Sequence, residues 1–108
     1  MARDRDEIYL EEIGEFGKKI VEFTSGISYE SFAADEKLQL AVLKLIENIG
    51  EASKRLSELA RERHSNVNWR KAMAMRDKLV HDYMDVDLEV VWNVASKEVP
   101  ALLESLKA

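Results

Sequence analysis

Three side chains suited to phosphate chemistry lie within residues 76–83 of this chain. Arg76 is followed five positions later by His81 and two positions after that by Tyr83. Arginine is a permanent cation whose planar guanidinium binds phosphate in a bidentate manner. Histidine is the side chain whose unperturbed pKa permits proton transfer near neutral pH. This R-x4-H-x-Y segment can therefore bind a phosphodiester and cleave it without a metal.

RNA is the phosphodiester that best suits these residue types, because it carries its own nucleophile, the 2′-hydroxyl. A general base removes the 2′-hydroxyl proton, and a general acid protonates the leaving 5′-oxygen. A cation stabilises the charge that develops on the phosphorane. Two copies of His81 can share the acid and base roles while Arg76 clamps the phosphate. The expected products are a 2′,3′-cyclic phosphate and a 5′-hydroxyl.

Each residue of the motif also has an ordinary structural interpretation. Arg76 can form a surface ion pair with a nearby carboxylate. His81 near a helix end can interact with the C-terminal dipole. Tyr83 can be a core residue whose hydroxyl reaches solvent. The residue types alone leave these alternatives open.

Composition restricts the class of protein. A chain of 108 residues fits a single helical domain, residues 1–108, with a net charge of −5, only four Gly and one Pro. It has no cysteine, which excludes thiolate chemistry. No segment has the length and apolarity of a membrane span, so we expect a cytoplasmic protein without a membrane contact. The spacing of Asp82, Asp85 and Asp87 lacks the glycine and distal glutamate of a calcium loop, so no metal site or cofactor is predicted.

The negative net charge argues against nucleic-acid binding, but the charge is unevenly distributed. Residues 54–78 hold eight basic and three acidic side chains. Candidate contacts to the RNA backbone in this stretch are Arg70, Lys71 and Lys78. A local positive field and a set of solvated helix faces explain the pattern equally well.

Hydrophobic periodicity predicts an all-α, antiparallel four-helix bundle. The helices are expected at residues 4–24, 35–63, 69–83 and from 87 onward, with a connector between the first two. A kink or restart is expected at Pro100. On one ideal helix Arg76 and His81 would point about 140° apart. The third helix can end near residue 80, or a two-fold dimer can bring two motifs together, and we expect both.

The motif and its flanking residues resemble the HEPN superfamily, and within it the HepT-like toxins of HepT/MntA toxin–antitoxin pairs. The resemblance covers most of the chain. Its matching pieces are Ile49-Gly50-Glu51-Ala52, Asn68-Trp69-Arg70, Met75-Arg76-Asp77, His81-Asp82-Tyr83, Val86-Asp87-Leu88, Trp92 and Pro100.

The resemblance implies a metal-independent endoribonuclease whose cleft is built by a homodimer, with catalytic Arg76 and His81. Asp77 fits the family pattern as a residue that orients the pair, and Asn48 and Glu51 are expected to face the same cleft. The family further implies a partner nucleotidyltransferase, an MntA-like antitoxin, which silences the toxin by attaching AMP to Tyr83.

Two other functions remain open from the sequence. One is a non-catalytic HEPN-type module that binds a nucleotide or a nucleotidyltransferase. The other is a structural dimerisation bundle, for which the heptad spacing of the second helix suffices. Intact Arg76 and His81 favour the enzyme.

Overall fold

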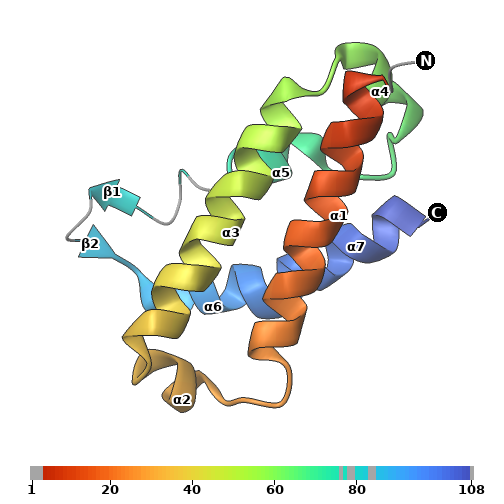
Figure 1. The fold of residues 1–108 in the computed structure, drawn as a ribbon. Coiled ribbons are helices and arrows are strands. Elements are labelled where there is room, and N and C mark those ends of the chain that lie inside the picture. Colours follow the sequence, from red (N-terminus) through yellow and green to blue (C-terminus); the bar gives the residue numbers. More distant parts are fainter. Residues whose placement is uncertain (1–3, 76, 78–79, 83–84, 108) are drawn as a thin grey trace.

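The computed structural model describes residues 4–107 with the exception of 76, 78, 79, 83 and 84. Figure 1 shows two long antiparallel helices, α1 and α3, crossed by a third helical run near the C-terminus. The elements in chain order are α1 (Arg5–Thr24), α2 (Tyr29–Ala33), α3 (Glu36–Arg55), α4 (Glu58–Arg63), α5 (Trp69–Met73), β1 (Val80–Asp82), β2 (Asp85–Val86), α6 (Leu88–Asn93), a π-helical turn η1 (Val94–Glu98) and α7 (Val99–Lys107). The all-α class predicted from the sequence is confirmed, with one short hairpin added.

The first helix begins and ends where the sequence predicts. Asp4 caps α1 by accepting a hydrogen bond from the Asp6 amide. The helix ends at Thr24 with Ser25 as its C-cap, and Gly26 follows with a φ of 77°, a left-handed conformation that favours glycine. Ile13 and Ile20 are fully buried, so the 4-3 spacing of apolar residues places one face of α1 on the core.

The second predicted helix is divided in two, so the prediction of one helix over 35–63 is wrong. Leu56 has extended backbone, with φ −64° and ψ 141°. Ser57 then caps α4, and its hydroxyl accepts from the Ala60 amide. The break also changes which apolar residues are buried, since Leu56 is 3% exposed and Leu59 is 56% exposed. A local serine cap therefore outweighs the heptad spacing at this point.

The connector between α1 and α3 contains the short helix α2. Ser28 caps it by accepting from the Ser31 amide. Phe32 is fully buried, and the centroid of its ring lies 5.2 Å from the ring centroid of Trp92. Tyr29 contacts the same indole edge-on at 6.3 Å. The two aromatic side chains attach the connector to the core.

The third predicted helix ends much earlier than expected, and the prediction of a helix over 69–83 is wrong. α5 stops at Met73, and the chain continues through turn bonds from Met75 N to the Ala72 carbonyl and from Asp77 N to the Ala74 carbonyl. Strand β1 then pairs antiparallel with β2, with Val80 opposite Val86. The segment predicted as a connection, 84–86, contributes β2, while residue 84 lies outside the described part of the chain.

The last helical run changes its winding just before Pro100, which confirms the predicted kink or restart. The Val99 amide donates to the carbonyl of Val94, five residues earlier. Proline has no amide hydrogen, and its ring crowds the carbonyl four residues before it in a regular α-helix. The wider π turn therefore accommodates Pro100 at the start of α7.

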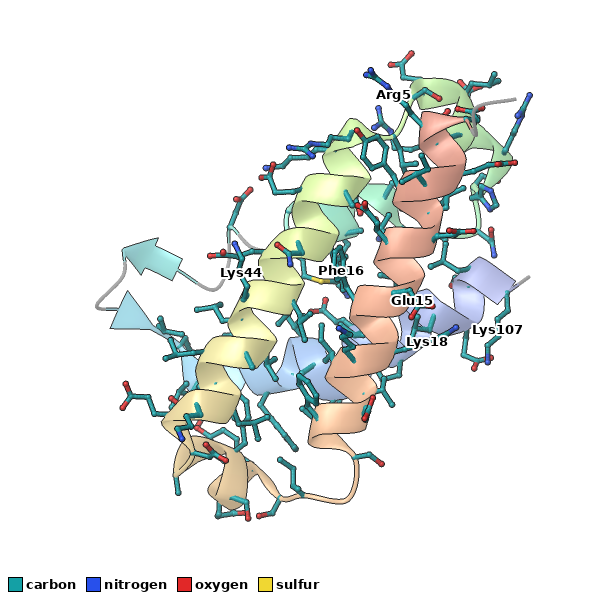
Figure 2. The ribbon with its side chains drawn as sticks, in the orientation of Figure 1. Arg5, Glu15, Phe16, Lys18, Lys44 and Lys107 are labelled. Carbon is teal, nitrogen blue, oxygen red and sulfur yellow. The ribbon has the colours of Figure 1, made fainter. Side chains whose placement is uncertain are left out.

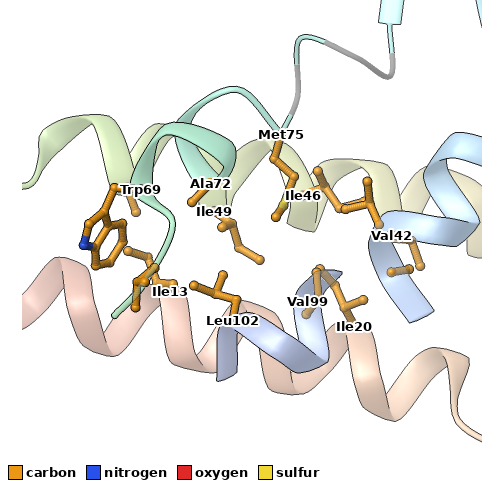
Figure 3. Packing of buried hydrophobic residues seen from close by; sticks show 14 of the residues in the cluster. Ile13, Ile20, Val42, Ile46, Ile49, Trp69, Ala72, Met75, Val99 and Leu102 are labelled. Carbon is orange, nitrogen blue, oxygen red and sulfur yellow. The ribbon is translucent and has the colours of Figure 1, made fainter. Parts of the chain in front are cut away.

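The core lies where α1, α3, α5 and the last helical run meet (Figure 3). Ile13 and Ile20 come from α1, Ile46 and Ile49 from α3, and Val99 from α7; all five are fully buried. Of the helices in the described ranges, none combines the length and apolarity needed to span a bilayer.

Candidate active site

The segment that leads into the motif is fixed to the helical body. Asn68 caps α5, with its side-chain oxygen accepting from the Lys71 amide at 3.1 Å. Trp69 is 7% exposed and donates its indole N–H to the His64 carbonyl at 2.9 Å. A buried Trp with a satisfied N–H is a strong packing anchor. The start of α5 is therefore held both by a cap and by the core.

The chain remains anchored up to the residue before the motif. Met75 is 4% exposed and belongs to the core cluster, whereas Asp77 is exposed. Arg76 lies between them in sequence and, like Lys78 and Tyr83, lies outside the described residues. The chain thus changes from buried at Met75 to exposed at Asp77.

His81 is at the centre of strand β1, not on a helix. In Figure 1 the strands β1 and β2 appear on the side of α3 away from α1. The sequence allows the third helix to end near Val80, but α5 ends seven residues earlier, at Met73. The 140° separation expected between Arg76 and His81 on one helix therefore does not apply. Because His81 lies on a strand, helical spacing does not describe its position.

The two supporting candidates on α3 have different environments. Asn48 is half-buried and Glu51 is exposed. α3 packs against α5, the helix that precedes the motif. Both residues therefore lie on an element adjacent to the anchored segment. Their place in a cleft shared with the motif stays a prediction.

The basic candidates on α5 also differ from each other. Arg70 and Lys71 are both exposed, but Lys71 forms an ion pair with Glu98, with Nζ and Oε1 2.7 Å apart. The Glu98 side chain is only 13% exposed. This pair links α5 to the π-helical turn. Arg70 is therefore the more available phosphate contact of the two.

A small cavity of about 200 Å³ lies beneath this ion pair. Met75, Ala72 and Leu102 form part of its apolar lining, while Asn66 closes one side by donating to the Ser105 carbonyl. Glu98 was not identified from the sequence as part of this region. Its position in the chain, 27 residues after Lys71, carries no local signal of the contact.

One ionisable group among the described residues has a clearly shifted pKa, and it is remote from the motif in sequence. A hydrogen bond from the Ser57 amide, followed by one from its hydroxyl, holds the pKa of Asp6 below its ordinary value. Across residues 4–107, apart from the five positions left out, no cluster of three or more His, Cys, Asp or Glu could hold a metal ion.

Comparison with known proteins identifies the family. The model of the family described as ribonuclease HepT-like matches residues 13–108. A protein of Thermococcus cleftensis named "Probable ribonuclease HepT" is 43% identical over 94 residues, covering 87% of this chain and 86% of its own. A protein of Caldanaerobacter subterraneus subsp. tengcongensis named "Putative RNase" is 40% identical over 99 residues, covering 92% of this chain and 88% of its own. No solved structure matches the chain significantly. The chain belongs to the HepT-like ribonuclease family.

Proposed function

We propose that this protein is a metal-independent endoribonuclease whose active site is formed by Arg76 and His81. The observation that carries the proposal is the R-x4-H-x-Y motif following a firmly anchored α5, in a chain of a ribonuclease family. Both buried Met75 and capped α5 support a fixed starting point for the motif. Pre-organised catalytic groups lower the barrier because little reorganisation is needed during the reaction.

The proposed reaction is internal attack by the 2′-hydroxyl on the adjacent phosphorus. One imidazole accepts the 2′-hydroxyl proton, the P–O5′ bond breaks, and an imidazolium donates its proton to the departing O5′. Arg76 binds the non-bridging oxygens and offsets the added negative charge. The 2′,3′-cyclic phosphate and the 5′-hydroxyl together account for every atom of the substrate.

The two imidazoles are proposed to come from two copies of the chain, because each chain has one His81. A two-fold dimer with two motifs at one cleft supplies both the base and the acid. Asp77, exposed at the end of the anchored segment, is proposed to orient Arg76 and His81. Asn48 and Glu51 on α3 are proposed to line the same cleft. Arg70, Lys71 and Lys78 are proposed to contact the RNA backbone. Lys71 would exchange its ion pair with Glu98 for an RNA phosphate.

Regulation is proposed to follow the HepT pattern. A partner nucleotidyltransferase acting as antitoxin would transfer AMP from ATP to the Tyr83 hydroxyl, releasing pyrophosphate. Two residues from His81, the attached nucleotide would add bulk and negative charge where an RNA phosphate must bind. Like charges repel more strongly in a partly desolvated cleft than in water. The protein would then act as the toxin of a toxin–antitoxin pair.

Cleavage of total cellular RNA by the purified protein in EDTA tests the proposal. The matched control is the Arg76→Ala/His81→Ala double variant, checked for folding by circular dichroism. We expect cleavage that ends in 2′,3′-cyclic phosphate and is absent in the control. A folded, unmodified wild-type dimer that leaves RNA intact would instead favour the non-catalytic module that binds a nucleotide or a nucleotidyltransferase.

A further inference from the structure

A groove lies between α1 and α7, and the proposed active site does not use it. It has a volume of about 580 Å³ and an apolar floor formed by Leu10, Val21, Leu103 and Leu106. All four side chains are only partly buried. Apolar surface of this kind, bordered by charged residues, is typical of a site where another macromolecule binds.

Gly14 lies in this groove, and none of the described residues explains why it is a glycine. A Cβ added there would meet no atom within 4 Å. Gly17, one turn further on, differs because a Cβ there would approach Leu103 Cδ2 to 2.8 Å. A glycine in the middle of a helix is unfavourable unless it allows a close backbone approach. α7 supplies that approach at Gly17, whereas no described residue does so at Gly14, where the space is open to a partner.

The charged residues around Gly14 indicate which kind of partner the groove can bind. Glu11 and Lys18 both line the groove, three residues before and four residues after Gly14. Seven residues apart, they lie on almost the same helix face. Glu104 and Lys107 place the same two signs on the α7 wall. Figure 2 shows Lys18 on the side of α1 that faces Lys107. The border of the groove is therefore balanced, although the chain as a whole carries −5.

We propose that the α1–α7 groove binds α1 of a second copy of this chain, through a two-fold axis near Gly14. An antiparallel second α1 places its Lys18 opposite Glu11 and its Glu11 opposite Lys18. Both copies then make the same contacts, as an isologous interface requires. A partner of one strong charge sign would be matched by a border of the opposite sign, not by a balanced one.

The rearrangement needed at Lys18 is small. Lys18 lies 3.6 Å from Glu15 in the single chain, and both side chains are about two-thirds exposed, at 69% and 68%. Exposed ion pairs of this kind contribute little, so Lys18 can exchange partners at low cost. The contact lies on α1 and α7, while the motif follows α5. The inference therefore does not depend on the ribonuclease proposal and adds a second interface to any dimer at the motif.

Charge reversal in single and mixed variants tests the two-fold arrangement. Glu11→Lys leaves four positive charges at the interface, and Lys18→Glu leaves four negative charges. We expect each variant alone to have half the wild-type assembly mass in sedimentation equilibrium, with at least tenfold weaker association. In an equimolar mixture, the lysine introduced at position 11 of one chain faces the glutamate introduced at position 18 of the other. The unchanged Lys18 and Glu11 face each other in the same pair of chains, so we expect the mixture to recover the wild-type mass.

Matched controls are Glu12→Lys and Lys19→Glu, which change the neighbouring exposed residues outside the groove. We expect both to keep the wild-type mass, and all variants to keep the wild-type circular dichroism. Equal masses for wild type, Glu11→Lys and Lys18→Glu would overturn the proposal and leave the groove for a different partner. It would also be overturned by a monomeric wild type, by a mixture that fails to associate, or by controls that dissociate equally.

RNA cleavage by the same variants separates the two proposals. We expect Glu11→Lys and Lys18→Glu to cleave RNA as the wild type does, because neither residue belongs to the motif. Loss of mass with retained cleavage supports the groove contact as a separate interface. Loss of cleavage in both variants, but not in the Glu12→Lys and Lys19→Glu controls, would contradict an interface that is independent of the active site.

Discussion

Lys71 on α5 contacts Glu98 in the π-helical turn, with Nζ and Oε1 2.7 Å apart. One member is half-exposed and the other is 13% exposed, so the pair is partly shielded from solvent. The contact joins the helix that leads into the motif to the last helical run. Its two ends lie far apart in the sequence, so it contributes to tertiary structure and not only to local helix stability.

Removing either member of this pair should lower stability. Lys71→Met and Glu98→Gln should each reduce the free energy of unfolding by about 0.5–1.5 kcal/mol, between the values for exposed and buried pairs. The double variant should lose less than the sum of the two, because the pair can be lost only once. Urea denaturation measures all three. Strict additivity would mean that the two side chains do not interact.

Arg70 should affect RNA binding without affecting stability. It is exposed on the same helix as Lys71. Arg70→Met should change the free energy of unfolding by less than about 0.5 kcal/mol. It should weaken RNA binding and reduce the slope of log K against log salt concentration by roughly 0.7–1, the value expected for one phosphate contact. Filter binding at several salt concentrations checks this, and an unchanged slope would remove Arg70 from the RNA contacts.

His81 should be essential for turnover, whereas His64 should not. His81→Gln should lower kcat by about 10²–10⁴-fold, the usual contribution of a general acid or base. His64→Gln is the matched control, because His64 contacts Trp69 through its backbone carbonyl, which the substitution keeps. Cleavage of a labelled RNA under single-turnover conditions compares the two. Equal rates for the two variants would show that the imidazole of His81 does not transfer the proton.

Tyr83 should be the acceptor of AMP. Incubation with the cognate nucleotidyltransferase and ATP should modify the wild type but not Tyr83→Phe, because the phenol oxygen is the proposed nucleophile. Tyr29→Phe serves as the control, since Tyr29 lies on α2 and packs against Trp92 of α6. Intact-mass spectrometry gives the stoichiometry. Full modification of Tyr83→Phe would place the acceptor elsewhere.

Asp6 should give the protein an acid-sensitive component of stability. Hydrogen bonds from the Ser57 amide and hydroxyl lower the pKa of Asp6 in the folded state from 3.8. A lowered folded pKa means that the stabilisation is complete above the unfolded value and is lost as the pH falls through the folded value. Asp6→Asn should therefore reduce the dependence of the unfolding free energy on pH below about pH 5. Ser57→Ala, which keeps the amide donor, should reduce it only in part. An Asp6→Asn curve parallel to that of the wild type would contradict the assignment.

The helices were predictable where local signals and burial agree. The 4-3 apolar spacing of α1, bounded by Asp4 and by Ser25-Gly26, contains all that is needed to define that helix. Pro100 likewise indicates the change of winding in the last helical run. In both cases the determinant lies within a few residues of the feature that it controls.

The motif segment was not predictable as a hairpin, because its structure depends on pairing between Val80 and Val86. Residues 69–83 keep helical spacing, so periodicity alone favours a continuous helix. The break at Leu56–Ser57 was missed because the heptad spacing continues through it. The Ser57 cap is local, but Ser57 also contacts Asp6, 51 residues away. Candidate catalytic residues could be proposed from the sequence, but the element that carries His81 could not be predicted.

The π turn at Val94–Glu98 restricts which insertions and deletions this segment can accept. A turn closed five residues back holds one residue more than an α-helical turn. A single-codon insertion upstream of Pro100 would produce such a turn, and a single-codon deletion would rotate Glu98 away from Lys71 by about 100°. Length variation among descendants of this gene should therefore be rare within this turn.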